Sequence, residues 1–127
     1  MGQSYSDLVV WQKAMALVTE IYRLTAEFPA RELYGLADQM RRAAVSVPSN
    51  IAEGQGRLSH KDFRLFLGHA RGSLLELATQ IQIAMNVQYL TRENGNRVLE
   101  QSTEVGRILN GLIAAMTAAT THDPKAA

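Results

Sequence analysis

The 127-residue sequence contains no cysteine, which excludes both a disulfide framework and a thiolate metal site. Aromatic residues make up only 6% of the chain, and the formal net charge is +1, so the chain as a whole is not a polycation. The longest apolar stretch, around residues 108–119, is interrupted by Asn110 and Gly111 and is too short for a membrane-spanning helix, which needs about 20 residues. The first residues carry no basic region followed by an apolar run, so no secretory signal is expected. These absences predict a cytoplasmic protein that does not interact with a membrane.

What is present is ordinary for a folded protein, with 46% hydrophobic and 20% charged residues. A chain of this length buries roughly two-thirds of the surface that it exposes when unfolded. No internal repeat, linker or low-complexity tract interrupts the sequence. We therefore expect a single domain over residues 1–127.

The first helix is expected over residues 7–28, which contain neither glycine nor proline and are followed by Pro29. Apolar residues repeat there with the three-and-four spacing of a helix, and they form two adjacent stripes. Because so wide an apolar face exceeds what one partner helix covers, it predicts burial in a bundle or an oligomer. One stripe is Leu8, Trp11, Met15, Val18, Tyr22 and Thr25, and the other is Val10, Ala14, Leu17, Ile21, Leu24 and Phe28.

The second helix is expected over residues 31–55, with a kink at Pro48 but no break. Proline lacks the N–H that a helix needs, yet the apolar stripe keeps its phase across this position. Gly54 and Gly56 are expected to end the helix. The core stripe is Leu36, Met40, Ala44, Val47 and Ile51.

Two further helices are expected over residues 59–90 and 92–120, followed by a polar tail, residues 121–127. Ser59 with Asp62 three residues later is typical of a helix N-terminus. Four helices joined by short connections favour antiparallel neighbours. The sequence therefore predicts an all-α fold, an antiparallel up-down-up-down four-helix bundle.

The sequence offers no arrangement of residues typical of catalysis. It contains no Glu-x-x-His pair of the kind that holds a di-iron centre in a bundle, and His60 and His69 fall on opposite faces of their helix. Ser46, Ser49 and Ser73 have no nucleophile elbow, and no phosphate-binding loop follows a strand. We expect no enzyme activity, no cofactor and no metal site.

Positive charge is concentrated between residues 39 and 71, where six cations face only two carboxylates, a net charge of +4. One interpretation is a surface that binds the phosphates of RNA or DNA. In the other, Asn50 and Glu53 satisfy backbone left open by Pro48, while the cations pair with carboxylates such as Glu76 and Glu104. The sequence leaves both open. The six candidate residues are Arg41, Arg42, Arg57, Lys61, Arg64 and Arg71.

Several segments resemble the bacterial four-helix-bundle proteins related to those encoded in intervening sequences of ribosomal RNA genes. The resemblance is carried by Asp7-Leu8-Val9-Val10-Trp11-Gln12-Lys13-Ala14-Met15, by Tyr34-Gly35-Leu36, and by residues 39–54, which include Pro48-Ser49-Asn50 and Glu53-Gly54. It continues through residues 70–77 and 104–109. The resemblance implies a four-helix bundle assembled into a ring-shaped homopentamer, in a family whose biochemical role is mostly unassigned.

These observations favour a non-catalytic homo-oligomeric module, a pentamer by the resemblance, that binds RNA or DNA weakly through the basic residues. The alternative is a structural scaffold that binds another protein and has no nucleic-acid role. Self-association is also favoured by a row of mostly small residues on the second helix, which would admit a neighbouring helix. This row is Leu33, Ala37, Ala44, Pro48 and Ala52.

Overall fold

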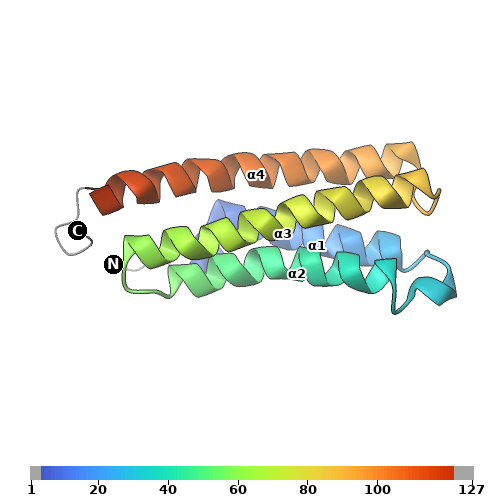
Figure 1. Cartoon of the computed structure of the whole chain (residues 1–127), viewed down its shortest axis with the longest axis horizontal. Coiled ribbons are helices and arrows are strands. Elements are labelled where there is room, and N and C mark those ends of the chain that lie inside the picture. Colours follow the sequence, from blue (N-terminus) through green and yellow to red (C-terminus); the bar gives the residue numbers. More distant parts are fainter. Residues whose placement is uncertain (1–3, 122–127) are drawn as a thin grey trace.

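The computed structural model describes residues 4–121 of the chain, and this part is all-α (Figure 1). Four helices follow one another, and two short 3-10 turns, η1 and η2, precede the first two. No strand occurs among the described residues, so the all-α class with four helices is confirmed. The elements are η1 (Tyr5–Asp7), α1 (Val9–Thr25), η2 (Ala30–Glu32), α2 (Leu36–Gln55), α3 (His60–Asn86) and α4 (Arg92–Thr121).

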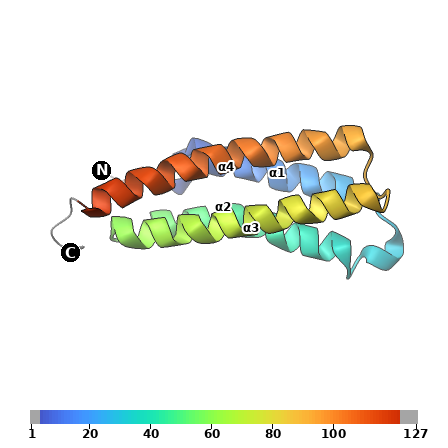
Figure 2. The ribbon, with the colours of Figure 1, turned by 45° about the horizontal axis from the view of Figure 1, so that its top comes forward.

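Each helix packs against the next one along the chain, and α1 also packs against α4, as expected for a bundle (Figure 2). The buried side chains of each helix lie on one face, because every third or fourth residue of a helix returns to the same face. In α3, for example, Leu67, Leu77 and Ile81 are fully buried. Each such side chain contributes about 1.5–3 kcal/mol by leaving water. The packing of these stripes holds the four helices together.

The two apolar stripes of α1 differ in how far they are buried. Val10, Ala14 and Leu17 belong to the stripe that is buried in the core, whereas Met15 and Tyr22 of the other stripe are exposed. The second stripe is therefore only partly buried within the chain, since Thr25 is buried and Trp11 and Val18 pack against the core, and it leaves apolar surface beside α2.

Three helix ends differ from their predicted positions by three residues or more. The first helix ends at Thr25 and not at residue 28, because Glu27 N–H and Phe28 N–H donate to carbonyls three residues back as the chain approaches Pro29. The second helix begins at Leu36 and not at residue 31, because η2 and a turn come first. Glu32 Oε1 accepts from Leu36 N–H at 2.9 Å and satisfies one of the open donors at this helix start.

The third helix ends at Asn86 and not at residue 90, because Gln88 adopts a left-handed φ of 66° that a continuing helix does not allow. Its start is as predicted, since Ser59 Oγ accepts from Asp62 N–H at 3.1 Å. The fourth helix runs to Thr121. The predicted tail otherwise lies outside the described residues.

Pro48 is buried inside α2, and the helix continues through it. The missing N–H leaves the carbonyl of Ala44 without its helical donor. Asn50 does not replace this donor, since its Nδ2 donates to Ser46 O at 2.8 Å and to Ser46 Oγ at 3.0 Å. The proposed repair of the opened backbone by Asn50 was therefore wrong. A kink at Pro48 stays a prediction.

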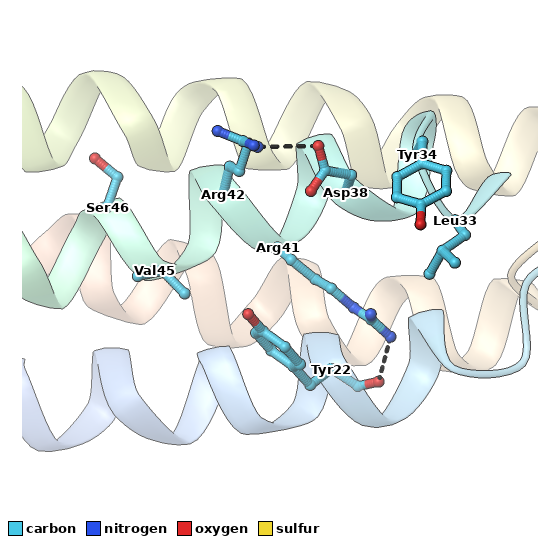
Figure 3. A pocket seen from close by; sticks show the side chains of 8 residues that line it. All are labelled: Tyr22, Leu33, Tyr34, Asp38, Arg41, Arg42, Val45 and Ser46. Carbon is cyan, nitrogen blue, oxygen red and sulfur yellow. Dashed lines mark hydrogen bonds and ion pairs between the residues drawn. The ribbon is translucent and has the colours of Figure 1, made fainter.

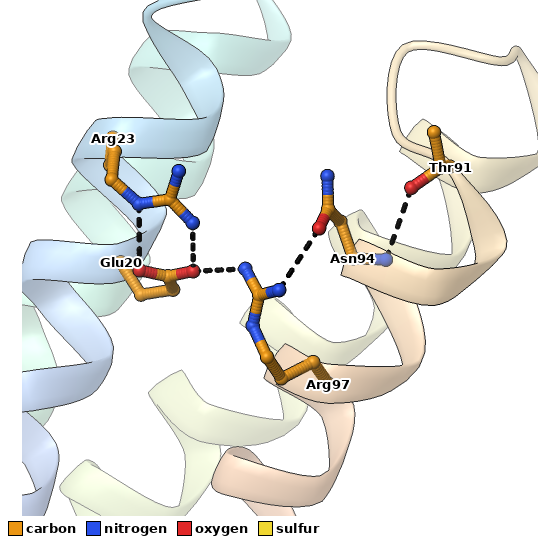
Figure 4. Close-up of polar contacts among 5 residues, drawn as sticks. All are labelled: Glu20, Arg23, Thr91, Asn94 and Arg97. Atoms are coloured by element: carbon orange, nitrogen blue, oxygen red, sulfur yellow. Dashed lines mark hydrogen bonds and ion pairs between the residues drawn. The ribbon is translucent and has the colours of Figure 1, made fainter.

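Polar contacts join α1 to α4 along the outside of the bundle. Glu20 accepts from Arg23 on its own helix and from Arg97 on α4 (Figure 4). Hydrogen bonds from Arg23, and then from Arg97, hold the pKa of the Glu20 carboxyl below its ordinary value despite partial burial. Arg97 also donates to Asn94 Oδ1 at 3.0 Å. Glu20 thus links α1 to α4 through the Arg97 guanidinium, while Arg23 holds the carboxylate from its own helix.

Candidate functional site

The structure divides the six predicted cations between two helical surfaces. Arg42 and Arg57 belong to α2 and its C-terminal end, and each pairs with a carboxylate one helical turn earlier. Arg42 Nε lies 2.9 Å from Asp38 Oδ2, and Arg57 Nη2 lies 2.7 Å from Glu53 Oε1. Exposed pairs of this spacing add little stability, yet they neutralise part of the local charge.

Arg41 is held by uncharged groups of α1 (Figure 3). Its Nε donates to the buried hydroxyl of Thr25 at 2.8 Å, and Nη2 donates to the carbonyl of Tyr22 at 3.5 Å. The guanidinium carbon lies 4.8 Å from the centre of the Tyr22 ring, close enough for a cation–π interaction. No carboxylate of residues 4–121 lies within 4.0 Å of Arg41, so its charge is not neutralised by an ion pair.

The other three cations, Lys61, Arg64 and Arg71, lie on α3 and line one open groove between α3 and α4. Within the described part of the chain, none of them has a carboxylate within 4.0 Å or a hydrogen-bonded partner. The groove measures about 450 Å³ and will be called the α3–α4 groove. Its other lining residues are Asp62, Leu65, Gly68, His69, Ile113 and Thr117. Three side-chain cations with free donors therefore converge on a single depression.

The carboxylates proposed as cross-helix partners for these cations are engaged elsewhere. Glu104 lies 2.9 Å from Lys13 Nζ and 3.9 Å from Arg107 Nη2. The hydrogen bond from Lys13 holds the pKa of the Glu104 carboxyl below its ordinary value. Glu76 accepts from Gln80 Nε2 at 3.2 Å. The predicted pairing of Glu76 and Glu104 with the six cations is not found among the described residues.

Ser46 and Gly54 of α2 both lie in the contact between α2 and α3. Ser46 Oγ and Ser73 Oγ lie 2.8 Å apart and link the two helices. Gly54 is buried, and a β-carbon there would lie 2.8 Å from Phe66 Cβ and 2.9 Å from Phe63 Cδ1. Gly54 therefore allows α3 to approach α2, in addition to standing near the end of its helix.

The sequence did not predict a second groove, formed by α1 and α2 and here called the α1–α2 groove (Figure 3). It measures about 670 Å³. Tyr34 at its edge is 89% exposed, and Tyr22 and Val45 also face solvent. The sequence did offer one signal for this groove, namely the second apolar stripe of the first helix, which contains Tyr22. The lining residues are Tyr22, Leu33, Tyr34, Asp38, Arg41, Arg42, Val45 and Ser46.

Residues 4–121 contain no cluster of three or more His, Asp or Glu side chains that could hold a metal ion. None of the helices in this range is sufficiently long and apolar to cross a bilayer.

Fold and surface together define a small four-helix protein in which three cations that have no carboxylate partner among residues 4–121 line one groove. The chain belongs to the 23S rRNA-intervening sequence protein family, whose model matches residues 6–111. The resemblance seen in the sequence is thereby confirmed.

Five chains of solved structures are similar to this one. Among them is the crystal structure of a protein of unknown function from the S23 ribosomal protein family of Bacteroides thetaiotaomicron. It is 24% identical, and the match covers 83% of this chain and 98% of that chain with a TM-score of 0.75, which shows a shared fold. A comparison with curated proteins found no match.

Proposed function

We propose that the chain is a non-catalytic, self-associating four-helix module that binds RNA or DNA weakly through Lys61, Arg64 and Arg71. The observation that carries this proposal is that these three cations lack carboxylate partners among residues 4–121 and line the same α3–α4 groove. Lysine and arginine side chains with free donors bind phosphates, and such contacts supply affinity independent of sequence. Arg42 and Arg57 contribute less, since each already pairs with a carboxylate.

The proposed unit is an antiparallel up-down-up-down bundle with a bend at Pro48. Its support is the reversed order of paired residues, since Lys13 contacts Glu104 whereas Glu20, later in α1, contacts the earlier Arg97 of α4. The missing helical hydrogen bond at Pro48 supports a bend there.

The proposed assembly is a homopentamer, the ring that the family resemblance implies. The exposed apolar side chains beside α1 and α2 support burial against another copy. A ring multiplies three weak cationic contacts from each copy, so a nearly neutral chain can still bind a polyanion. This role fits the cytoplasmic location that the sequence predicts.

The proposal can be tested with two triple variants that each remove three positive charges. Lys61→Gln/Arg64→Gln/Arg71→Gln removes the unpaired cations, and Arg42→Gln/Arg57→Gln/Arg107→Gln removes cations that have carboxylate partners. We expect the first to weaken binding of a labelled single-stranded RNA or DNA by about a hundredfold at low salt, and the second by only a fewfold. Equal losses, or no binding by the wild-type chain at low salt, would contradict the proposal.

The second candidate is a scaffold that binds another protein through the α1–α2 groove. Its support is the exposure of Tyr34 and Tyr22 there, since tyrosine is enriched in protein interfaces. Measuring the binding of labelled RNA or DNA at increasing salt concentrations discriminates between the two candidates. A wild-type chain that assembles, yet shows no salt-dependent binding of RNA or DNA, would favour the scaffold.

A further inference from the structure

The C-terminal half of α3 carries an apolar face that no other helix of the chain covers. Leu75 is 60% exposed and Ile83 is 44% exposed. With Thr79 they follow the four-residue spacing of one helical face, and this face points away from the buried residues Leu77 and Ile81. We call Leu75, Glu76, Thr79 and Ile83 the α3 patch. It is an unpartnered helix surface and not part of the core.

Glu76 gives the α3 patch an uncompensated negative charge. Its side chain is exposed and accepts a hydrogen bond from the amide of Gln80 on the same helix at 3.2 Å. No lysine or arginine of residues 4–121 lies within 4.0 Å of its carboxylate.

The α1–α2 groove matches the α3 patch in its apolar lining and is opposite to it in charge. Tyr22, Leu33 and Val45 supply apolar lining to a depression of about 670 Å³. Arg41 lies in the same groove and has no carboxylate within 4.0 Å among the described residues. A helix face with an isolated carboxylate thus has a counterpart in an apolar groove with an isolated guanidinium.

The two surfaces also lie at the same level along the bundle. Ser46 lines the α1–α2 groove, and its hydroxyl lies 2.8 Å from that of Ser73, two residues before the α3 patch begins. A rotation about an axis parallel to the helices changes direction but preserves level. Such a rotation can therefore bring the patch of one copy against the groove of the next, as a ring with a head-to-tail interface requires.

We propose that the α3 patch of one copy packs into the α1–α2 groove of a second copy, with the Glu76 carboxylate against the Arg41 guanidinium. The inference rests on the self-association in the proposed function and names the surfaces that form it. Lys61 and Arg64 lie more than two helical turns before Glu76 on α3 and stay outside this contact, whereas Arg71 lies one turn before Leu75, at the edge of the patch.

The test measures the mass of the full chain by light scattering over a range of concentrations, with a monomer mass of 14.0 kDa as reference. Glu76→Arg places a cation against Arg41, and we expect assembly to require about a hundredfold higher concentration. Leu75→Glu should have a similar effect, because a charge replaces an exposed apolar contact. Glu100→Arg, which reverses an exposed charge on α4, is the matched control and should leave the mass unchanged.

Arg41→Glu alone also removes contacts with Thr25 and Tyr22, so its thermal unfolding must be followed beside its mass. The double variant Arg41→Glu/Glu76→Arg restores an opposite-charge pair, and we expect it to assemble better than Glu76→Arg. A wild-type oligomer that neither Glu76→Arg nor Leu75→Glu weakens would overturn this interface while leaving self-association intact. A wild-type chain that stays monomeric at every concentration would overturn both.

Discussion

Tyr89 donates its phenolic hydrogen to Glu32 Oε2 at 2.9 Å, and this bond joins the two connections at one end of the bundle (Figure 1). Glu32 belongs to the α1–α2 connection, and Tyr89 belongs to the α3–α4 connection. The other oxygen of Glu32 accepts from Leu36 N–H at 2.9 Å, and the Tyr89 ring lies 5.3 Å from that of Phe28. One carboxylate thus helps to start α2 and to hold the neighbouring loop.

The first prediction concerns the acid sensitivity of this end of the bundle. The hydrogen bond from Leu36 N–H, and then that from Tyr89, lowers the pKa of Glu32 below its ordinary value of 4.5. A carboxyl whose pKa is lower in the folded state stabilises the fold at pH values above its unfolded-state pKa. This stabilisation is lost as the pH falls through the folded-state pKa. Wild type should therefore unfold at a higher temperature than Glu32→Gln at pH 7, and the difference should shrink below about pH 4.5.

Thermal melts of both proteins between pH 3 and pH 7 check this expectation. Tyr89→Phe serves as the control, because it removes one donor to Glu32 and retains the ring that packs on Phe28. Its melting temperature at pH 7 should fall between those of wild type and Glu32→Gln. A difference between wild type and Glu32→Gln that is constant with pH would contradict the assignment.

The second prediction contrasts two helical glycines. Gly54→Ala should destabilise the fold by about 1–3 kcal/mol, because its new methyl group would meet Phe63 and Phe66 at less than 3.0 Å. Gly68→Ala should stabilise it by about 0.5–1 kcal/mol, because no atom lies within 4 Å of the new methyl and alanine favours a helix. Urea unfolding followed by circular dichroism measures both, and the same sign for both variants would count against the packing described.

The third prediction concerns the hydroxyl pair that links α2 and α3. Ser46 and Ser73 are hydrogen-bonded at 2.8 Å in a partly buried position. A double-mutant cycle with Ser46→Ala and Ser73→Ala should give a coupling energy of about 0.5–1.5 kcal/mol. Because Asn50 also donates to Ser46 Oγ, Ser46→Ala should cost more stability than Ser73→Ala. Additive effects of the two substitutions would show that the bond adds no stability.

The fourth prediction concerns the salt dependence of nucleic-acid binding. Each phosphate contact that is removed lowers the slope of log affinity against log salt by about 0.7 for a single strand. We expect Arg71→Gln to reduce this slope and to weaken all sequences alike, as loss of a backbone contact does. Arg42→Gln should change the slope less, since Asp38 already neutralises Arg42. Equal slopes for the two variants would contradict the proposal that Arg71, in the α3–α4 groove, contacts phosphate and that Arg42, paired with Asp38, contributes less.

The helices were predictable from the sequence because their signals are local. The cap at Ser59 and the three-and-four spacing of the buried α3 stripe each depend on neighbours within a few turns. This stripe is Leu67, Ala70, Leu74, Leu77 and Ile81. The end at Asn86 was missed because the left-handed Gln88 is neither glycine nor proline, the usual signals of a stop.

The candidate surface was predictable only as a concentration of charge. Sequence places Arg41 beside Arg42, but it does not show that Arg41 crosses to Thr25 on α1 while Arg42 turns back to Asp38. The Arg41 contact depends on which helices are neighbours, and the choice between the two contacts depends on the direction of each side chain. The α3 patch was missed for a different reason, since Glu76 and Thr79 interrupt its apolar pattern in the sequence.

The way Arg41 is held also bears on the kinetics of recognition. Its guanidinium is fixed by Thr25 and by the Tyr22 ring, so most of its rotamer freedom is already lost on folding. Lys61, Arg64 and Arg71 have no such restraint from any residue between 4 and 121, and each loses about 0.5–1.5 kcal/mol of conformational entropy when a ligand orders it. A contact made by Arg41 is therefore preorganised and suited to long residence, whereas contacts in the α3–α4 groove should form and break rapidly.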